Sequence, residues 1–221
     1  MRNRLFGPVA ASIAALMILP ALAGAKTIEM GDIPSTVKPT CPRVKKKCNA
    51  VTRTTVYPSS VGTNHSPMVV PRNGRLVAWT VKLGTPISTD RKWFDKNAGG
   101  VSQAKITILQ RVKGGGARVV KQGESAKLQA YFGKTAQFAL LKSIYVKKGQ
   151  IIALTVPTWA PVLAYGFDNT MAWRASRAKG QCGVSDYLTP HEQLAVKSFS
   201  TYYCSYKTSR LTYSVTLIPA L

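Results

Sequence analysis

The sequence predicts an all-β fold, an antiparallel β-sandwich of jelly-roll-like type, and three observations support this prediction. Apolar and polar side chains alternate with a period of two in several short segments, Gly- and Asn-containing turns separate these segments, and helix signals are scarce. Successive side chains of a strand point to opposite faces, so the alternation gives each sheet one apolar and one wet face. Two such sheets bury their apolar faces by packing together.

Four segments show the alternation most clearly, and they are predicted strands at residues 75–83, 105–112, 151–156 and 211–217. Turn signals lie between strand candidates. Asn73 and Gly74 predict a tight hairpin before the first of the four segments, because both turn positions of that hairpin type need positive φ. Glycines 114–116 and the segment 147–150 predict two further strand connections.

One helix is predicted, near the C-terminal end of the chain. Thr189 and Glu192 have the capping-box spacing, and Pro190 occupies the first helical position. A short helix is therefore expected over residues 190–197.

The first twenty-five residues predict an export signal, residues 1–25. Arg2 and Arg4 precede an apolar run, and small residues end at Ala25, where cleavage is expected. Pro20 interrupts the run before it reaches the roughly 20 residues of a membrane span, which argues against a retained anchor. We therefore expect a secreted or cell-envelope-associated protein without a transmembrane segment after signal removal.

After the signal, the sequence predicts two regions. Residues 26–50 contain several prolines and little apolar periodicity, so we expect an extended N-terminal segment that ends in a disulfide loop. Residues 51–221 show no linker and no internal repeat, and they are expected to form a single β-sandwich domain.

Four cysteines follow the signal: Cys41, Cys48, Cys182 and Cys204. An even number in an exported chain predicts two disulfides. Three pairings are possible, and the spacing favours Cys41 with Cys48 and Cys182 with Cys204. A zinc site is the alternative, but the close C-x-x-C pairs typical of such sites are absent from the sequence.

The chain is strongly basic, with 31 Lys and Arg against 8 Asp and Glu and a formal net charge of +23. The electrostatic field of so basic a protein attracts anions. For an exported protein we therefore expect an anionic cell-wall polymer or an acidic glycan as partner, and no sequence-specific binding of nucleic acid. The alternative is that the charge serves solubility alone. The sharpest local feature is the set of cations between Cys41 and Cys48. They are candidate polyanion-binding residues, and a solvated charged loop is the favoured alternative: Arg43, Lys45, Lys46 and Lys47.

Four tryptophans could pack in the core or stack on a ligand. Trp79 and Trp173 lie in apolar rows of strand segments and are expected to be core residues. Trp93 lies in a polar segment, and Trp159 lies between two prolines just past a predicted strand end. Trp93 and Trp159 are therefore the candidate exposed aromatics for ligand stacking, although a packing role is the favoured interpretation for each.

The sequence contains few of the residues and motifs that are typical of catalytic sites. His65 and His191 are the only histidines, which excludes a three-histidine metal centre, and neither a G-x-S-x-G elbow nor a P-loop occurs. No catalytic or metal-ligating residues and no cofactor are predicted. A calcium ion held by Asp90 and Asp95, or by Asp168 with Asn169, stays open, although neither set matches a known calcium loop.

Three segments, residues 69–79, 146–161 and 172–177, resemble exported, uncharacterised β-sandwich proteins of high-GC Gram-positive bacteria. The resemblance spans most of the chain after the signal. It implies export and the β-sandwich fold, and it implies no catalytic residues.

Together these observations predict an exported, non-catalytic β-sandwich module that binds an anionic cell-wall or glycan polymer. The alternative is a polysaccharide lyase acting on acidic polysaccharide, in which Arg or Lys would neutralise a carboxylate while Tyr or His removes a proton. Residues 131–137 resemble the Tyr-Phe-Lys strand pattern of alginate lyases, but the lysine is displaced and no Gln-x-His partner exists. The sequence does not indicate the oligomeric state.

Overall fold

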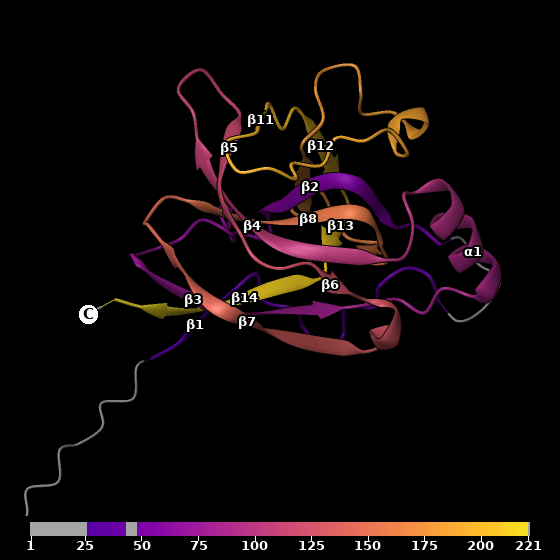
Figure 1. The fold of residues 1–221 in the computed structure, drawn as a ribbon, viewed down its shortest axis with the longest axis horizontal. Coiled ribbons are helices and arrows are strands. Elements are labelled where there is room, and N and C mark those ends of the chain that lie inside the picture. The colour runs from indigo at the N-terminus through magenta and orange to yellow at the C-terminus, as the bar shows by residue number, and fades with distance from the viewer. Residues whose placement is uncertain (1–25, 43–47, 221) are drawn as a thin grey trace, which may run out of the picture.

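The computed structural model describes residues 26–42 and 48–220, and in this part of the chain two antiparallel sheets pack face to face (Figure 1). The predicted all-β sandwich is confirmed. The jelly-roll-like winding stays a prediction. The expected signal, residues 1–25, lies outside the described residues. Within the described ranges, no helix combines the length and the hydropathy that a membrane crossing requires.

The smaller sheet contains two of the predicted strands at its centre. Its strand order is β1 (Ile28–Met30), β14 (Tyr213–Pro219), β3 (Gly74–Lys82) and β7 (Thr135–Val146). The alternating segments 75–83 and 211–217 correspond to β3 and β14, which pair with each other.

The larger sheet forms the second layer. Its strand order is β11 (Phe199–Ser200), β5 (Ala117–Gln122), β4 (Gln103–Arg111), β8 (Ile151–Ala160), β2 (Val51–Ser60), β10 (Ala172–Ala175) and β12 (Cys204–Lys207), with β6 (Ala126–Lys127) paired to β4. A separate ribbon consists of β9 (Leu163–Tyr165) and β13 (Ser209–Leu211). Two short 3-10 helices, η1 (Gln129–Tyr131) and η2 (Val184–Asp186), lie in the connections.

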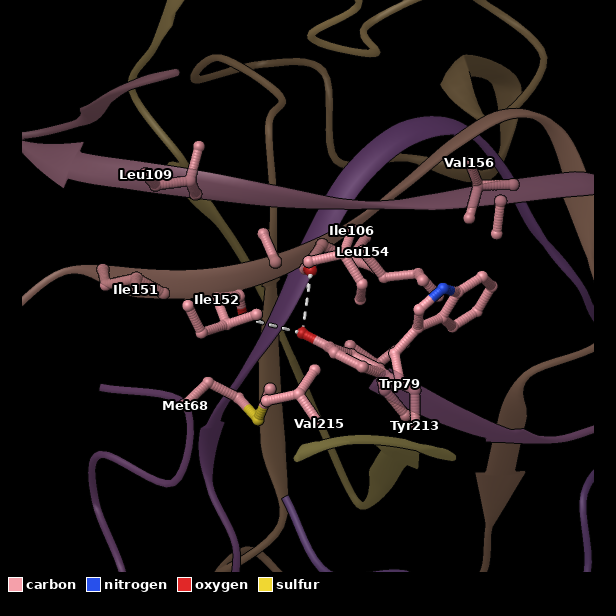
Figure 2. Packing of buried hydrophobic residues seen from close by; sticks show 14 of the residues in the cluster. Met68, Trp79, Ile106, Leu109, Ile151, Ile152, Leu154, Val156, Tyr213 and Val215 are labelled. Carbon is pink, nitrogen blue, oxygen red and sulfur yellow. Dashed lines mark hydrogen bonds between the residues drawn. The ribbon is translucent and has the colours of Figure 1, made fainter. Parts of the chain in front are cut away.

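The core fills the space between the two layers (Figure 2). Trp79 of β3 and Val215 of β14 come from the smaller sheet, and Leu154 of β8 comes from the larger one. Burying a side chain of this size contributes about 1.5–3 kcal/mol. Tyr213 reaches across the core, and its hydroxyl donates a hydrogen bond of 3.0 Å to the carbonyl oxygen of Ile152, so its polar atom is satisfied without water.

The turn predictions have mixed outcomes. Glycines 114–116 all have positive φ and connect β4 to β5, and Gly149 does the same between β7 and β8, as predicted. The hairpin predicted at Asn73 and Gly74 is wrong, because neither residue has positive φ and Gly74 begins β3 instead. Gly74 is required by close packing, since a Cβ there would lie 2.4 Å from the carbonyl oxygen of Ile218 on β14.

The helix predicted over residues 190–197 is wrong. That segment lies beside the larger sheet and ends in a turn at residues 195–198: the backbone N–H of His191 donates to the oxygen of Arg53 at 2.8 Å, and the N–H of Lys197 donates to that of Val119 at 2.8 Å. These long-range bonds satisfy backbone groups that a helix would pair internally. The α-helix of the described residues is instead α1 (Ser88–Asn97), in the polar segment for which no helix is predicted from the sequence.

The N-terminal segment packs closely on the sandwich. Its strand β1 extends the smaller sheet. Further along, Thr40 N–H donates to the oxygen of Leu163 at 2.7 Å, and Thr85 N–H donates to that of Cys41 at 2.6 Å. A Cβ on Gly84 would lie 1.9 Å from the carbonyl oxygen of Thr40, so only glycine fits at this contact.

Candidate functional site

A cleft of about 550 Å³ lies between α1, the β9 strand and the segment that follows β10. We call it the aromatic cleft, because six aromatic side chains line it: Trp93, Phe94, Tyr165, Trp173, Tyr187 and Tyr206. Its polar lining includes Thr52, Asp90 and Arg177. The volume falls within the range of about 300–1,000 Å³ that is typical of small-ligand sites.

Two rings stand nearly parallel at the cleft. The planes of Trp93 and Tyr187 differ by 22°, and their centroids are 6.2 Å apart. Trp93 is 43% exposed, and Tyr165 on β9 is also exposed. The cleft therefore presents flat, apolar ring faces to solvent, an arrangement suited to a ligand that itself has a flat apolar face.

Helix α1 holds Trp93 in place through the residues that follow it. Phe94 is buried and stacks on Trp159, with centroids 4.8 Å apart and planes 19° apart. Asp95 accepts a hydrogen bond of 2.8 Å from the indole Nε1 of Trp159. The helix is ten residues long and has no side-chain cap at its N-terminus, so these tertiary contacts, rather than intrinsic propensity, stabilise it.

The two tryptophans predicted as exposed have opposite outcomes. Trp93 is exposed, as a stacking role requires, but Trp159 as an exposed stacking residue is wrong, because its side chain has no exposed surface and takes the favoured packing role. Strand β8 does not end before Trp159 but continues through Pro157 to Ala160. The β2–β8 register shifts between Thr52 and Thr54, and such an irregularity accommodates a strand proline.

Trp79 and Trp173 are buried, as predicted for core residues. Trp173 also forms part of the aromatic cleft. It stacks on Tyr206, with centroids 4.3 Å apart, and its indole N–H donates to the hydroxyl of Ser209 at 2.9 Å. Because its polar atom is already satisfied, Trp173 offers a ligand only its ring.

Arg177 fixes the wall that carries Tyr187. Its guanidinium donates to the carbonyl oxygens of Asp186, Tyr187 and Thr52, which joins this wall to β2. The side chain is only 3% exposed, and burial lowers the pKa of Arg177, while the nearby Tyr206 and two carboxylates raise it. Arg177 remains a cation. No carboxylate in the described ranges lies within ion-pair distance of it.

Asp90 supplies the carboxylate of the cleft. It lies in the first turn of α1 and is partly exposed. It forms no ion pair with any residue in the described part of the chain. A free carboxylate beside aromatic faces can accept hydrogen bonds from ligand hydroxyls.

Both predicted disulfides are confirmed. Cys41 bonds to Cys48, and Cys182 bonds to Cys204. Cys48 and Cys182 line the aromatic cleft, so each cross-link ties one part of its boundary to the sandwich. The Cys182–Cys204 disulfide joins the start of the segment that carries Tyr187 to β12, the strand that follows the segment.

The predicted polyanion-binding residues Arg43, Lys45, Lys46 and Lys47 lie outside the described residues.

The carboxylates weighed for calcium are engaged separately. Asp95 binds the indole of Trp159. Asp168 accepts hydrogen bonds from the hydroxyl and the backbone N–H of Thr170, and these bonds, the hydroxyl's first, lower the pKa of Asp168. Across residues 26–42 and 48–220, no three His, Cys, Asp or Glu side chains gather as a metal site would need.

Sequence reasoning missed most of the cleft. Phe94, Tyr165, Tyr187 and Tyr206 come from four separate elements, and no local pattern joins them. A signal for α1 was present, because Ser88, Thr89 and Asp90 are typical of a helix N-terminus. That signal would have placed Trp93 and Phe94 on one helix.

Comparisons of the chain with protein-family models, curated proteins and solved structures found no match. The resemblance to exported, uncharacterised β-sandwich proteins of high-GC Gram-positive bacteria stays an expectation from the sequence.

Proposed function

We propose that this protein is an exported, non-catalytic glycan-binding module whose aromatic cleft holds sugar rings. The observation that carries the proposal is the pair of nearly parallel rings of Trp93 and Tyr187 beside the carboxylate of Asp90. A sugar ring has apolar C–H faces and a rim of hydroxyls. Aromatic faces bind the former, and a carboxylate accepts hydrogen bonds from the latter.

The cleft supports binding rather than turnover. A lyase needs a proton-abstracting Tyr or His beside a cation that is free to neutralise a carboxylate. Arg177 donates to three backbone carbonyls, and no histidine lines the cleft. The described lining of this site thus contains tyrosines, but it offers no free cation that could neutralise the carboxylate of a substrate.

The charge of the chain favours an acidic glycan or wall polymer as the ligand. A net charge of +23 raises the local concentration of polyanions and speeds their association. This part of the proposal rests on the sequence. The expected consequence is affinity that falls steeply with added salt, since charges are screened beyond about 8 Å at physiological ionic strength.

Calorimetric titration with oligosaccharides of wall and acidic glycans tests the proposal. We expect Trp93→Ala and Tyr187→Ala each to weaken binding by about tenfold or more, because an aromatic contact contributes about 0.5–1.5 kcal/mol beyond its buried area. Tyr145→Ala is the matched control, since it removes an exposed tyrosine of β7 that does not line the cleft. Equal affinities in all three variants would refute the proposal.

The same oligosaccharides distinguish a module from a lyase. Elimination creates a double bond that absorbs in the ultraviolet. A steady rise in absorbance with the wild-type protein would replace the binding proposal with the lyase alternative. A flat trace with ligands that bind supports the module.

A further inference from the structure

A second cavity, of about 480 Å³, lies beside β10 and differs from the aromatic cleft in chemistry. Arg111 of β4, Arg174 of β10, Tyr57 of β2 and His65 line it, and no Asp or Glu does. We call it the cationic cavity. The turn that closes it connects β4 to β5, at the end of the larger sheet that lies away from α1 (Figure 1).

Adjacent residues of β10 separate the two sites. Trp173 lines the aromatic cleft, and Arg174 lines the cationic cavity. Successive side chains of a strand point to opposite faces, so the two sites lie on different sides of β10. A change at one can therefore be made without altering the lining of the other.

Both guanidinium groups act on the interior of the cavity. Tyr57 is the cross-strand partner of Arg174, and Arg111 lines the same cavity. Burial raises the pKa of the Tyr57 phenol, and the positive charges of Arg174 and Arg111 oppose that rise. The ring of Tyr57 packs against Tyr202, with centroids 5.3 Å apart. Arg174 in turn donates a hydrogen bond of 3.0 Å to the carbonyl oxygen of Tyr202.

Neither arginine is neutralised within the described chain. The ion pair found there joins Arg53 to Glu192, and no carboxylate lies within 4.0 Å of Arg111 or Arg174. Arg174 uses one donor on Tyr202, and a guanidinium has five. Two planar cations with unused donors, a phenol and an imidazole thus face one concave space.

We propose that the cationic cavity is a second binding site and that it takes an oxyanion, a carboxylate or phosphate group. Guanidinium groups bind such groups through paired, charge-assisted hydrogen bonds. Tyr57 adds a neutral hydroxyl donor, and the glycine-rich β4–β5 turn lets the backbone approach closely. The oxyanion can be free in solution or carried by an acidic glycan, and the site binds it without any reaction.

Amide NMR of the nitrogen-labelled protein tests the inference, with inorganic phosphate and free glucuronate as probes. We expect saturable shifts at Gly115, Gly116 and Thr201. Arg111→Gln and Arg174→Gln should each weaken binding by roughly tenfold, the loss expected for one charge-assisted contact. Lys113→Gln is the matched control, because it removes the same charge from the same turn without touching the cavity lining.

The outcomes distinguish a specific oxyanion site from non-specific electrostatic attraction. Equal weakening in the two arginine variants and in Lys113→Gln would overturn the inference, as would unchanged binding in the arginine variants. Arg111 is exposed, so its substitution should leave the fold intact even if Arg174→Gln loosens Tyr202. Tighter binding of an acidic oligosaccharide than of glucuronate supports the site with a polymer as source, and equal binding supports it with a free anion.

This test is independent of the aromatic cleft. Trp93→Ala should leave the phosphate shifts unchanged, since Trp93 lines only the other site. Loss of glycan binding in that variant, with phosphate binding retained, would support both proposals separately. Loss of phosphate binding in Trp93→Ala would contradict the existence of a separate oxyanion site.

Discussion

The indole Nε1 of Trp159 donates a hydrogen bond of 2.8 Å to Oδ1 of Asp95, and this contact joins the buried end of β8 to α1. The other oxygen of Asp95 accepts from the side-chain amide of Gln129 at 3.3 Å. One carboxylate therefore connects the helix to two segments that are remote from it in sequence. The position of Trp93, two residues before Asp95, depends on this connection.

Replacing Asp95 with Ala should destabilise the protein by about 1–3 kcal/mol, because the buried indole N–H of Trp159 would lose its acceptor. Urea unfolding gives this value directly. We also expect weaker glycan binding, since α1 would hold Trp93 less firmly. Lys96→Ala is the control on the same helix, and its exposed side chain should change stability by less than about 0.5 kcal/mol. An Asp95→Ala variant as stable as Lys96→Ala would contradict this role.

Removing the two disulfides should have unequal effects. The Cys182–Cys204 bond closes a separation of 22 residues, and its replacement by two serines should cost about 3 kcal/mol, whereas the Cys41–Cys48 bond closes 7 residues and should cost about 2 kcal/mol. Denaturant midpoints of the two double variants measure the difference. Glycan affinity should fall more in the Cys182/Cys204 variant, which frees the segment carrying Tyr187. The reverse order of stability would show that loop length does not control the effect.

Stability should fall as the pH rises above about 10. Burial raises the pKa of the Tyr213 phenol well above its ordinary value of about 10, so above that pH the unfolded chain loses a proton that the folded chain keeps. Each such tyrosine adds a slope of up to about 1.4 kcal/mol per pH unit. Tyr213→Phe should cost about 1 kcal/mol at neutral pH, from the lost hydrogen bond to Ile152, and should make the alkaline decline shallower. Unfolding curves measured across this pH range check both effects, and an unchanged slope would contradict the assignment.

Gly84→Ala should destabilise the protein by about 1–3 kcal/mol, because the new methyl group would collide with the backbone oxygen of Thr40. Backbone cannot rotate away as a side chain can. Gly123→Ala is the comparison, since the atom nearest to its added Cβ is a side-chain carbon of Leu140 at 3.1 Å. Thermal unfolding of the two variants should show the larger loss at Gly84. Similar losses of stability in the two variants would contradict this prediction, because they would show that the N-terminal segment shifts to accommodate the methyl group.

Local rules predicted much of the framework correctly. The alternation at residues 75–83 and 211–217 predicted β3 and β14, because the period of side chains along a strand is a property of the backbone itself. Spacing also predicted both disulfides. These features depend on neighbours in sequence, or on cysteines with few alternative partners.

Predictions from local sequence patterns failed where the backbone forms hydrogen bonds with residues that are distant in sequence. The capping-box spacing of Thr189 and Glu192 is genuine, but the segment bonds to Arg53 and to Thr55, whose hydroxyl accepts from the backbone N–H of Gln193 at 3.0 Å. Only the folded sheet creates those partners. The aromatic cleft escaped prediction for the same reason, since its rings come from elements scattered along the chain.

Alternation of side chains and cysteine spacing are local properties of the chain, so the two packed sheets and both disulfides follow from the amino-acid sequence alone. It also marked Trp93 and Trp159 as residues of interest. The exposure of Trp93 at a cleft and the complete burial of Trp159 became clear only from the folded arrangement of the elements. The exposure of a side chain depends on which remote elements cover it, and α1 covers Trp159 while leaving Trp93 uncovered.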